Sequence, residues 1–450
     1  MLKAVSLFTG AGIGDIGFRE AGYSFCLMTE KEPQRLSLAE INFSKAEMCV
    51  GDINELVEEV VYKVLSILTR ENTELDMLSC TAPCQGMSKS GQGTLLRNIR
   101  HGKRPKFDPR NRLILPALSI IHRLSPRFVV FENVCEMRNT MIEDENGKIR
   151  SILDIIDTRL ADDYVGKAYD IQFADYGIPQ RRKRLITVYT RDEVAIEHYQ
   201  KGVELVPNKT HSKNGTNGLN AWTSVTEAIR GFPPLDAKSK ETASNPDIPF
   251  HRVPVLDKVK YEWVKYALPG ASAFDNQCIN PKCKYKYNRL HGTLKNHKGI
   301  NQSNKNTPLY CERCGSLLPR PHTVHKDGSL KIMSGYTSAY KRMDPILPCP
   351  ALTRNLSYPC SDHKIHPFEN RVLSLAEAFV IQTISSYNYM WGPIKDQKGR
   401  FKPVASDTLI RLTLGESIPP KFTELLGRHL IKMTRKDSMF SRNVRTALLF

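Results

Sequence analysis

The sequence predicts an α/β fold: a parallel sheet with helices on both faces, followed by a smaller, loop-rich region. Two patterns carry this prediction. Up to about residue 190, short apolar runs alternate with helix-like stretches, which is typical of parallel strands joined by helical crossovers. Beyond about residue 192 the sequence becomes polar and is punctuated by proline and glycine, which favours loops.

The individual elements follow from these runs. We expect strands at 4–8, 23–29, 47–50, 75–80, 128–131 and 185–189. Helical periodicity occupies 56–68 and 113–124, and it returns at 374–382 and 421–433.

Composition narrows the class of protein. The 450 residues suffice for two folded units. No apolar run has the roughly 18 residues of a membrane span, and the first residues lack a secretory pattern, so we expect a soluble, intracellular protein. The formal charge is +18, and residues 276–342 hold 13 Lys/Arg against two acids. Such a segment favours a polyanionic partner, although a solvated basic face is the alternative.

A glycine loop follows the first expected strand, in the sequence LFTGAGIGDIGF. Gly10, Gly12 and Gly14 permit a tight turn and a close ligand approach at a helix N-terminus. Carboxylates at the next two strand ends, Glu30 and Asp52, are suited to ribose hydroxyls and an adenine edge. The pattern indicates a nucleotide-like cofactor and leaves NAD, FAD and S-adenosylmethionine open.

Reactive side chains follow three later strand ends. Cys84 lies after Pro83 in the turn TAPCQG, and Glu132 ends FVVFEN. Arg182 and Arg184 precede the run at 185–189. A thiolate nucleophile, a carboxyl group for a ring nitrogen and arginines for an oxygen or phosphate form a coherent set at one sheet edge.

In their order, these motifs resemble the cytosine-5 DNA methyltransferase family, of the bacterial modification-methylase type. The glycine loop, Glu30, Asp52 and Pro83-Cys84-Gln85 are similar to its cofactor and nucleophile motifs. The later motifs are matched by Glu132-Asn133-Val134, by Gln180, Arg182 and Arg184, by Arg371, and by GESIPP at 415–420. The resemblance implies a Rossmann-like S-adenosylmethionine-dependent methyltransferase sheet with a smaller target-recognition domain.

The resemblance also implies residue roles and a reaction. The catalytic residues would be Cys84, Glu132, Arg182 and Arg184. The contacts to S-adenosylmethionine would be Phe8, Gly10, Gly12, Glu30, Asp52 and Pro83. Cys84 would add to carbon 6 of a flipped cytosine, and a lid at about 88–110 would close over the base. The chain departs from the family pattern at Thr81-Ala82, at Met87 and at Glu416, and Glu416 is therefore left outside the expected site.

Four cysteines are spaced as two pairs, Cys278 with Cys283 and Cys311 with Cys314. Four thiolates at such spacing favour a structural zinc ion, which would give a loop-rich segment a fold. The alternatives are unliganded thiols, or replacement of one cysteine by a nearby histidine, namely His291, His297, His322 or His325.

The expected organisation is a catalytic and cofactor-binding domain at 1–192 and a target-recognition domain at 193–370. The basic zinc-binding-like module lies at 276–320, and 371–450 returns to the catalytic domain. By family analogy we expect double-stranded DNA as partner, a separately acting restriction endonuclease, a monomer, and a bacterial cytoplasmic, nucleoid-associated location. The alternatives are a tRNA cytosine-5 methyltransferase, a non-catalytic DNA-binding relative, and an NAD- or FAD-dependent oxidoreductase.

Overall fold

A computed structural model gives the fold of the chain. It describes residues 1–83, 87, 108–295, 301–304, 306–333, 339–361, 363–396 and 399–436. Cys84 and most of the expected lid lie outside these residues.

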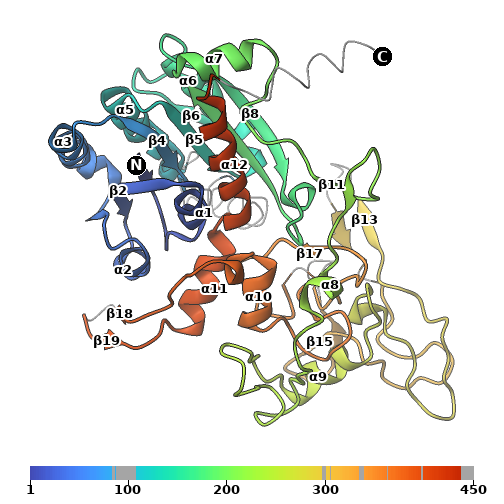
Figure 1. Ribbon diagram of the computed structural model, residues 1–450. Coiled ribbons are helices and arrows are strands. Elements are labelled where there is room, and N and C mark those ends of the chain that lie inside the picture. The colour runs from blue at the N-terminus through green and yellow to red at the C-terminus, as the bar shows by residue number, and fades with distance from the viewer. Residues whose placement is uncertain are drawn as a thin grey trace.

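A seven-stranded sheet forms the centre of the first lobe (Figure 1). Its order is β3-β2-β1-β4-β5-β10-β8. The strands are β1 (Leu2–Leu7), β2 (Tyr23–Glu30), β3 (Glu47–Val50), β4 (Leu75–Cys80), β5 (Phe128–Asn133), β8 (Val165–Gln172) and β10 (Lys183–Thr190). All six expected strands are therefore confirmed, and the α/β class with them.

The sheet differs from the prediction in two ways: β10 is antiparallel, and β8 was not predicted. β10 runs antiparallel to both β5 and β8, so the sheet is mixed rather than wholly parallel. An apolar run does not reveal strand direction, which depends on how the chain returns to the sheet. β8 was missed because it is an edge strand whose VGKAYDIQ sequence is only partly buried.

Helices cover both faces of the sheet, as predicted. One face packs against α3 (Ile53–Glu71), α5 (Ile114–Leu124) and α6 (Ile152–Leu160) in a single apolar cluster. The other face packs against α1 (Ile13–Ala21), α2 (Pro33–Asn42), α7 (Glu193–Gln200) and α12 (Pro420–Met433).

Helix α12 comes from far along the sequence and lies directly against α1 (Figure 1). Gly17 makes this contact possible, because a Cβ there would lie 2.0 Å from the carbonyl oxygen of Pro420. The hydroxyl of Thr423 donates to the carbonyl of Gly14 at 2.6 Å. The match of Gly14 and Gly17 to a dinucleotide pattern thus has a packing cause.

The rest of the chain forms a second region with little regular structure. Its helices are α8 (Val225–Ile229), α9 (Lys258–Lys265), α10 (Leu375–Ile381) and α11 (Asp407–Glu416). The remaining strands, including two hairpin strands of the first lobe, are β6 (Met141–Glu143), β7 (Ile149–Ser151), β9 (Gln180–Arg181), β11 (His211–Ser212), β12 (Asn220–Ala221), β13 (Thr293–Lys295), β14 (Asn301–Ser303), β15 (His322–Val324), β16 (Leu330–Ile332), β17 (Cys349–Pro350), β18 (Ile394–Lys395) and β19 (Phe401–Lys402).

Buried arginines lie beside the apolar clusters of this region. The guanidinium of Arg342 donates to the carbonyls of Val264, Ala267 and His366. Arg371 forms a bidentate pair with Glu377, at 2.7 and 2.8 Å. Among the described residues, no helix is both long and apolar enough to cross a membrane.

Candidate active site and metal centre

A cavity of about 1370 Å³ opens at the carboxyl edge of the sheet. Typical small-molecule sites occupy about 300–1,000 Å³, so this cavity has room for a cofactor and a second ligand. Its wall includes the ends of β1, β2, β4 and β5, and it extends to residues 351–361 and to the end of α11. Both regions of the chain therefore contribute to one site.

The loop after β1 forms one side of the cavity. Phe8 has φ +61°, a left-handed conformation that is rare for a bulky residue and tends to occur at functional sites. Gly10 also has positive φ, and a Cβ built on it would meet no atom within 4 Å. The N–H of Gly10 donates to Glu30 at 2.9 Å. A ligand can thus approach the backbone closely beside a buried carboxylate.

Asp52 lies in the cavity wall, but its carboxylate already has partners. It caps α3 by accepting from the backbone N–H of Asn54 and forms an ion pair with Lys31 at 2.8 Å. The hydrogen bond from Lys31 is the main reason that the pKa of Asp52 lies below its usual value. The carboxylate is therefore held in place by Lys31 at the cavity wall.

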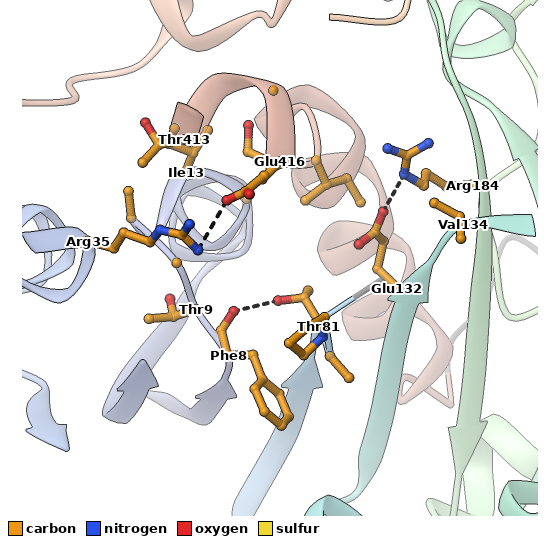
Figure 2. Close-up of a pocket in the computed structure, with 18 of the residues that line it drawn as sticks. Phe8, Thr9, Ile13, Arg35, Thr81, Glu132, Val134, Arg184, Thr413 and Glu416 are labelled. Carbon is orange, nitrogen blue, oxygen red and sulfur yellow. Dashed lines mark hydrogen bonds and ion pairs between the residues drawn. The ribbon is translucent and has the colours of Figure 1, made fainter. Parts of the chain in front are cut away.

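The turn after β4 leads into the cysteine motif and is anchored on two sides. The hydroxyl of Thr81 donates to the carbonyl of Phe8 at 2.8 Å (Figure 2). The side-chain amide of Asn133 donates to the carbonyl of Ala82 at 3.0 Å. Pro83, the last described residue before Cys84, lines the cavity. The chain therefore leaves β4 in a fixed direction at the sheet edge.

Glu132 and Arg184 form an ion pair across two strands, with Nε of Arg184 at 2.9 Å from Oε1 of Glu132 (Figure 2). The antiparallel register of β5 and β10 sets this pairing, since Ile186 lies opposite Glu132. Both side chains are mostly buried and line the cavity. A carboxyl group and a guanidinium are thus presented together at the same side of the cavity.

Arg182 lies differently from Arg184, although both belong to the same motif. It is 2% exposed, and its guanidinium donates to the carbonyls of Leu352 and Gly415 at 2.6 and 3.0 Å. Gln180, in the same motif, bonds the side chain of Gln382 and the backbone N–H of Leu352. These contacts tie the sheet to the second region, and Arg182 also lines the cavity.

Glu416 was left outside the expected site, but it lines the cavity. It pairs with Arg35 at 3.1 Å across the opening (Figure 2). Burial raises the pKa of the Glu416 carboxyl above its usual value. Family comparison by motif could not include it, because the chain departs from the pattern here. Thr81, another departure, was missed as an anchor for the same reason.

Comparisons with known proteins identify the family. The model of the "C-5 cytosine-specific DNA methylase" family matches residues 2–432. The chain belongs to this family.

Individual relatives of the chain support the same family assignment. The type II methyltransferase M1.HgaI of Avibacterium volantium is 25% identical over 95% of this chain and 98% of its own. M.AquIA of Picosynechococcus is 31% identical over 53% of this chain and 91% of its own. The solved Entamoeba histolytica methyltransferase EhMeth is 13% identical, with a TM-score of 0.48 over 97% of this chain and 99% of its own, a likeness too low to support a conclusion.

The protein is accordingly a DNA cytosine-5 methyltransferase that uses S-adenosylmethionine. The family match excludes the oxidoreductase alternative, which depended on a glycine pattern alone. The cavity fits the cofactor: Gly10 leaves open space at the backbone, and Glu30, which is 8% exposed, lies beside it.

The four paired cysteines gather in the second region, far from the glycine loop in sequence. The sulfur atoms of Cys278, Cys283, Cys311 and Cys314 all lie within 4.8 Å of one another. The distance from Cys278 to Cys314 is 3.7 Å, and that from Cys283 to Cys311 is 4.0 Å. Tetrahedral zinc with Zn–S bonds of about 2.3 Å requires sulfur atoms about 3.8 Å apart. The donor set therefore fits zinc.

The backbone supports the same geometry. Each cysteine pair is followed by a residue with positive φ, Lys284 after the first and Gly315 after the second. His291 and His322 are engaged elsewhere, with Thr307 and with the carbonyl of Arg320. Among the described histidines none joins the cluster, whereas the four cysteines form it together.

Proposed function

We propose that the enzyme methylates carbon 5 of a cytosine turned out of a specific duplex site, through a covalent bond between Cys84 and carbon 6. The observation that carries this proposal is the ion pair of Glu132 and Arg184 beside the anchored turn that leads to Cys84. Pro83, the residue before Cys84, lines the same cavity as this ion pair.

The chain's own groups perform most of the chemistry. The Cys84 thiolate forms a bond to carbon 6, and the ring electrons move to carbon 5. Glu132 would have to take up a proton first, and in its protonated form it donates a hydrogen bond or that proton at N3, which stabilises the charge that develops there. Arg184 holds the Glu132 carboxyl group in position and offers its remaining N–H groups to the base oxygen. After methylation, loss of the carbon 5 proton and expulsion of the thiolate restore the aromatic ring.

S-adenosylmethionine, when bound, supplies an electrophilic methyl group on its sulfonium. The residues that would hold it are Phe8, Gly10, Gly12, Glu30, Asp52 and Pro83. Gly10 offers backbone without a side chain, and Glu30 offers a carboxylate for hydroxyl groups. The base must leave the duplex stack at a cost of a few kcal/mol, because carbon 6 is hidden in the helix.

The second region would recognise the target. We assign target recognition to 193–370 and a structural zinc ion to Cys278, Cys283, Cys311 and Cys314, on the sulfur spacing given above. The chain would act as a bacterial modification enzyme, as a monomer, with a separate endonuclease of the same specificity. The type II methyltransferases among its relatives support this assignment.

One experiment tests the reaction and the nucleophile. Purified wild type and Cys84→Ala are incubated with tritiated S-adenosylmethionine and DNA that lacks cytosine methylation. Label in 5-methylcytosine with the wild type alone supports the proposal, and bisulfite sequencing then gives the target site. Label transferred equally by Cys84→Ala contradicts the covalent route. Label in tRNA but not in DNA would show that the substrate is RNA.

A second substrate separates covalent bond formation from turnover. A duplex with 5-fluorocytosine at the target blocks the last step, since fluorine cannot leave as a cation. Wild type should then remain bound through denaturation, whereas Cys84→Ala should not. Absence of the adduct from active wild type would contradict the covalent mechanism.

A further inference from the structure

The module that carries the four cysteines has an unusually basic outer surface. We define the module surface as the exposed side chains of Lys282, Lys284, Lys286, Tyr287, Arg289 and Arg313. In the described part of 276–320, Glu312 is the acid, and it pairs with Arg289 at 2.7 Å. None of the three lysines forms an ion pair with another described residue. A strong positive field therefore faces solvent here.

Exposed apolar and aromatic side chains lie among the basic side chains of the module. A surface that only contacts water has no need of them. Tyr287 is 82% exposed between two basic residues, and Leu290 is 62% exposed. Aromatic and apolar groups that alternate with lysines can pack against sugar and base edges while the ammonium groups meet phosphates.

The scaffold beneath this surface is rigid. Arg320 is fully buried and donates to the carbonyls of Asn276, Arg289 and Pro308, which lie on the two segments that carry the cysteine pairs. Asn276 in turn bonds the carbonyls of Trp263 and Pro319. The lysines thus project from a fixed base, which lowers the entropy cost of binding.

We propose that the module surface binds the phosphate backbone of duplex DNA, as a contact separate from the cavity that holds the reacting base. This inference rests on the proposed function, because the duplex is the substrate of that reaction. Phosphate contacts do not read sequence, so the surface raises affinity for every duplex and leaves the choice of target to other residues.

The test compares Lys282→Gln/Lys284→Gln/Lys286→Gln with a matched control that removes three exposed lysines outside the module, Lys45→Gln/Lys148→Gln/Lys436→Gln. Affinity for a fluorescein-labelled duplex of arbitrary sequence is measured by anisotropy between about 50 and about 200 mM salt. Three lost phosphate contacts should lower the slope of log affinity against log salt by roughly 2–3. We expect affinity to fall about tenfold or more in the module variant and less in the control.

Steady-state methylation of the target duplex gives the second measurement. The lysine substitutions should raise KM for DNA and leave kcat nearly unchanged. Equal salt slopes for the module variant and the control would overturn the proposal, and so would a loss confined to kcat. Both results are distinct from failure of the proposed function, in which wild type binds duplex with the expected slope but places no label in 5-methylcytosine.

Discussion

The hydroxyl of Thr81 is bonded to the carbonyl oxygen of Phe8, the residue whose backbone is in the left-handed conformation. The bond joins the end of β1 to the turn that leads into the cysteine motif. Phe8 and Thr81 both line the cavity, and under the proposed function Phe8 contacts the cofactor and Thr81 precedes the nucleophile. One hydrogen bond therefore couples the positions of the two reactants.

Thr81→Val should weaken this coupling while it keeps the shape of the side chain. A buried hydrogen bond contributes about 0.5–1.5 kcal/mol net, so kcat/KM should fall roughly 2- to 12-fold. Thr81→Ser retains the hydroxyl and should restore most of the activity. The check is a comparison of kcat and KM for S-adenosylmethionine in the three proteins. A loss of activity in the serine variant with none in the valine variant would mean that the methyl group, and not the hydroxyl, matters.

Substitution of the two arginines of this motif should have different effects, one on activity and the other on stability. Arg184→Gln removes the partner of Glu132 and should lower kcat by about 100-fold or more, with little change in melting temperature. Arg182→Gln leaves the carbonyls of Leu352 and Gly415 without a donor, and should cost about 3–5 kcal/mol of unfolding free energy. Activity assays and urea unfolding measure the two effects. If Arg184→Gln were the less stable variant, the assignment of roles would be wrong.

Zinc should be bound in stoichiometric amount and should stabilise the second region. Cys314→Ser removes one thiolate and should lower the metal content and the melting temperature. Cys360→Ser is the matched control, because Cys360 is also exposed but lies outside the cluster. Metal analysis and thermal melting with and without a chelator give the result. Equal metal content in both variants would contradict the assignment of Cys314 as a zinc ligand.

His366 should make stability depend on pH. It is buried, and its Nδ1 accepts from the backbone N–H groups of Phe368 and Glu369. Burial, followed by the charge of Arg371, lowers the pKa of His366 to about 4. Because the pKa is depressed on folding, the neutral ring stabilises the fold above about pH 6.5, and this stability is lost as pH falls towards 4. The loss amounts to about 3 kcal/mol.

The measurement is urea unfolding of wild type and His366→Asn between pH 7.5 and 5. Asparagine can accept the same backbone N–H groups but does not titrate. The difference in unfolding free energy between the two proteins should therefore shrink as pH falls, as the wild type weakens. A difference that stays constant with pH would show that the pKa of His366 is the same in the folded and unfolded states, which would contradict the prediction.

Much of the first lobe could be predicted, because its strands are buried apolar runs of ordinary length. Leu75–Cys80 and Phe128–Asn133 were recognisable for this reason. The edge strand Val165–Gln172 was not, since half-buried polar residues give no clear period. The sequence around β10 does not indicate the direction of the strand either. That direction sets the pairing of Arg184 with Glu132.

The site was predicted in part. Motif order brought Glu132, Arg184, Glu30 and Gly10 to one edge, where the structure has them. Arg182 also lines the cavity, and its catalytic role stays a prediction; its bonds to the carbonyls of Leu352 and Gly415 left no local signal in the sequence. Cys84 and the expected lid lie outside the described residues, so their roles stay predictions.

The contact of α12 with α1 has a consequence for synthesis in the cell. The apolar side of α1 is completed by Phe422 and Leu426. Ribosomes add about 5–20 residues per second, so roughly 20–80 s separate the emergence of the two helices. During that time the nascent cofactor lobe exposes an uncovered apolar surface to the cell. We therefore expect packing of the first lobe to be completed only after α12 has been made, and a chain that stops before α12 to be prone to aggregation.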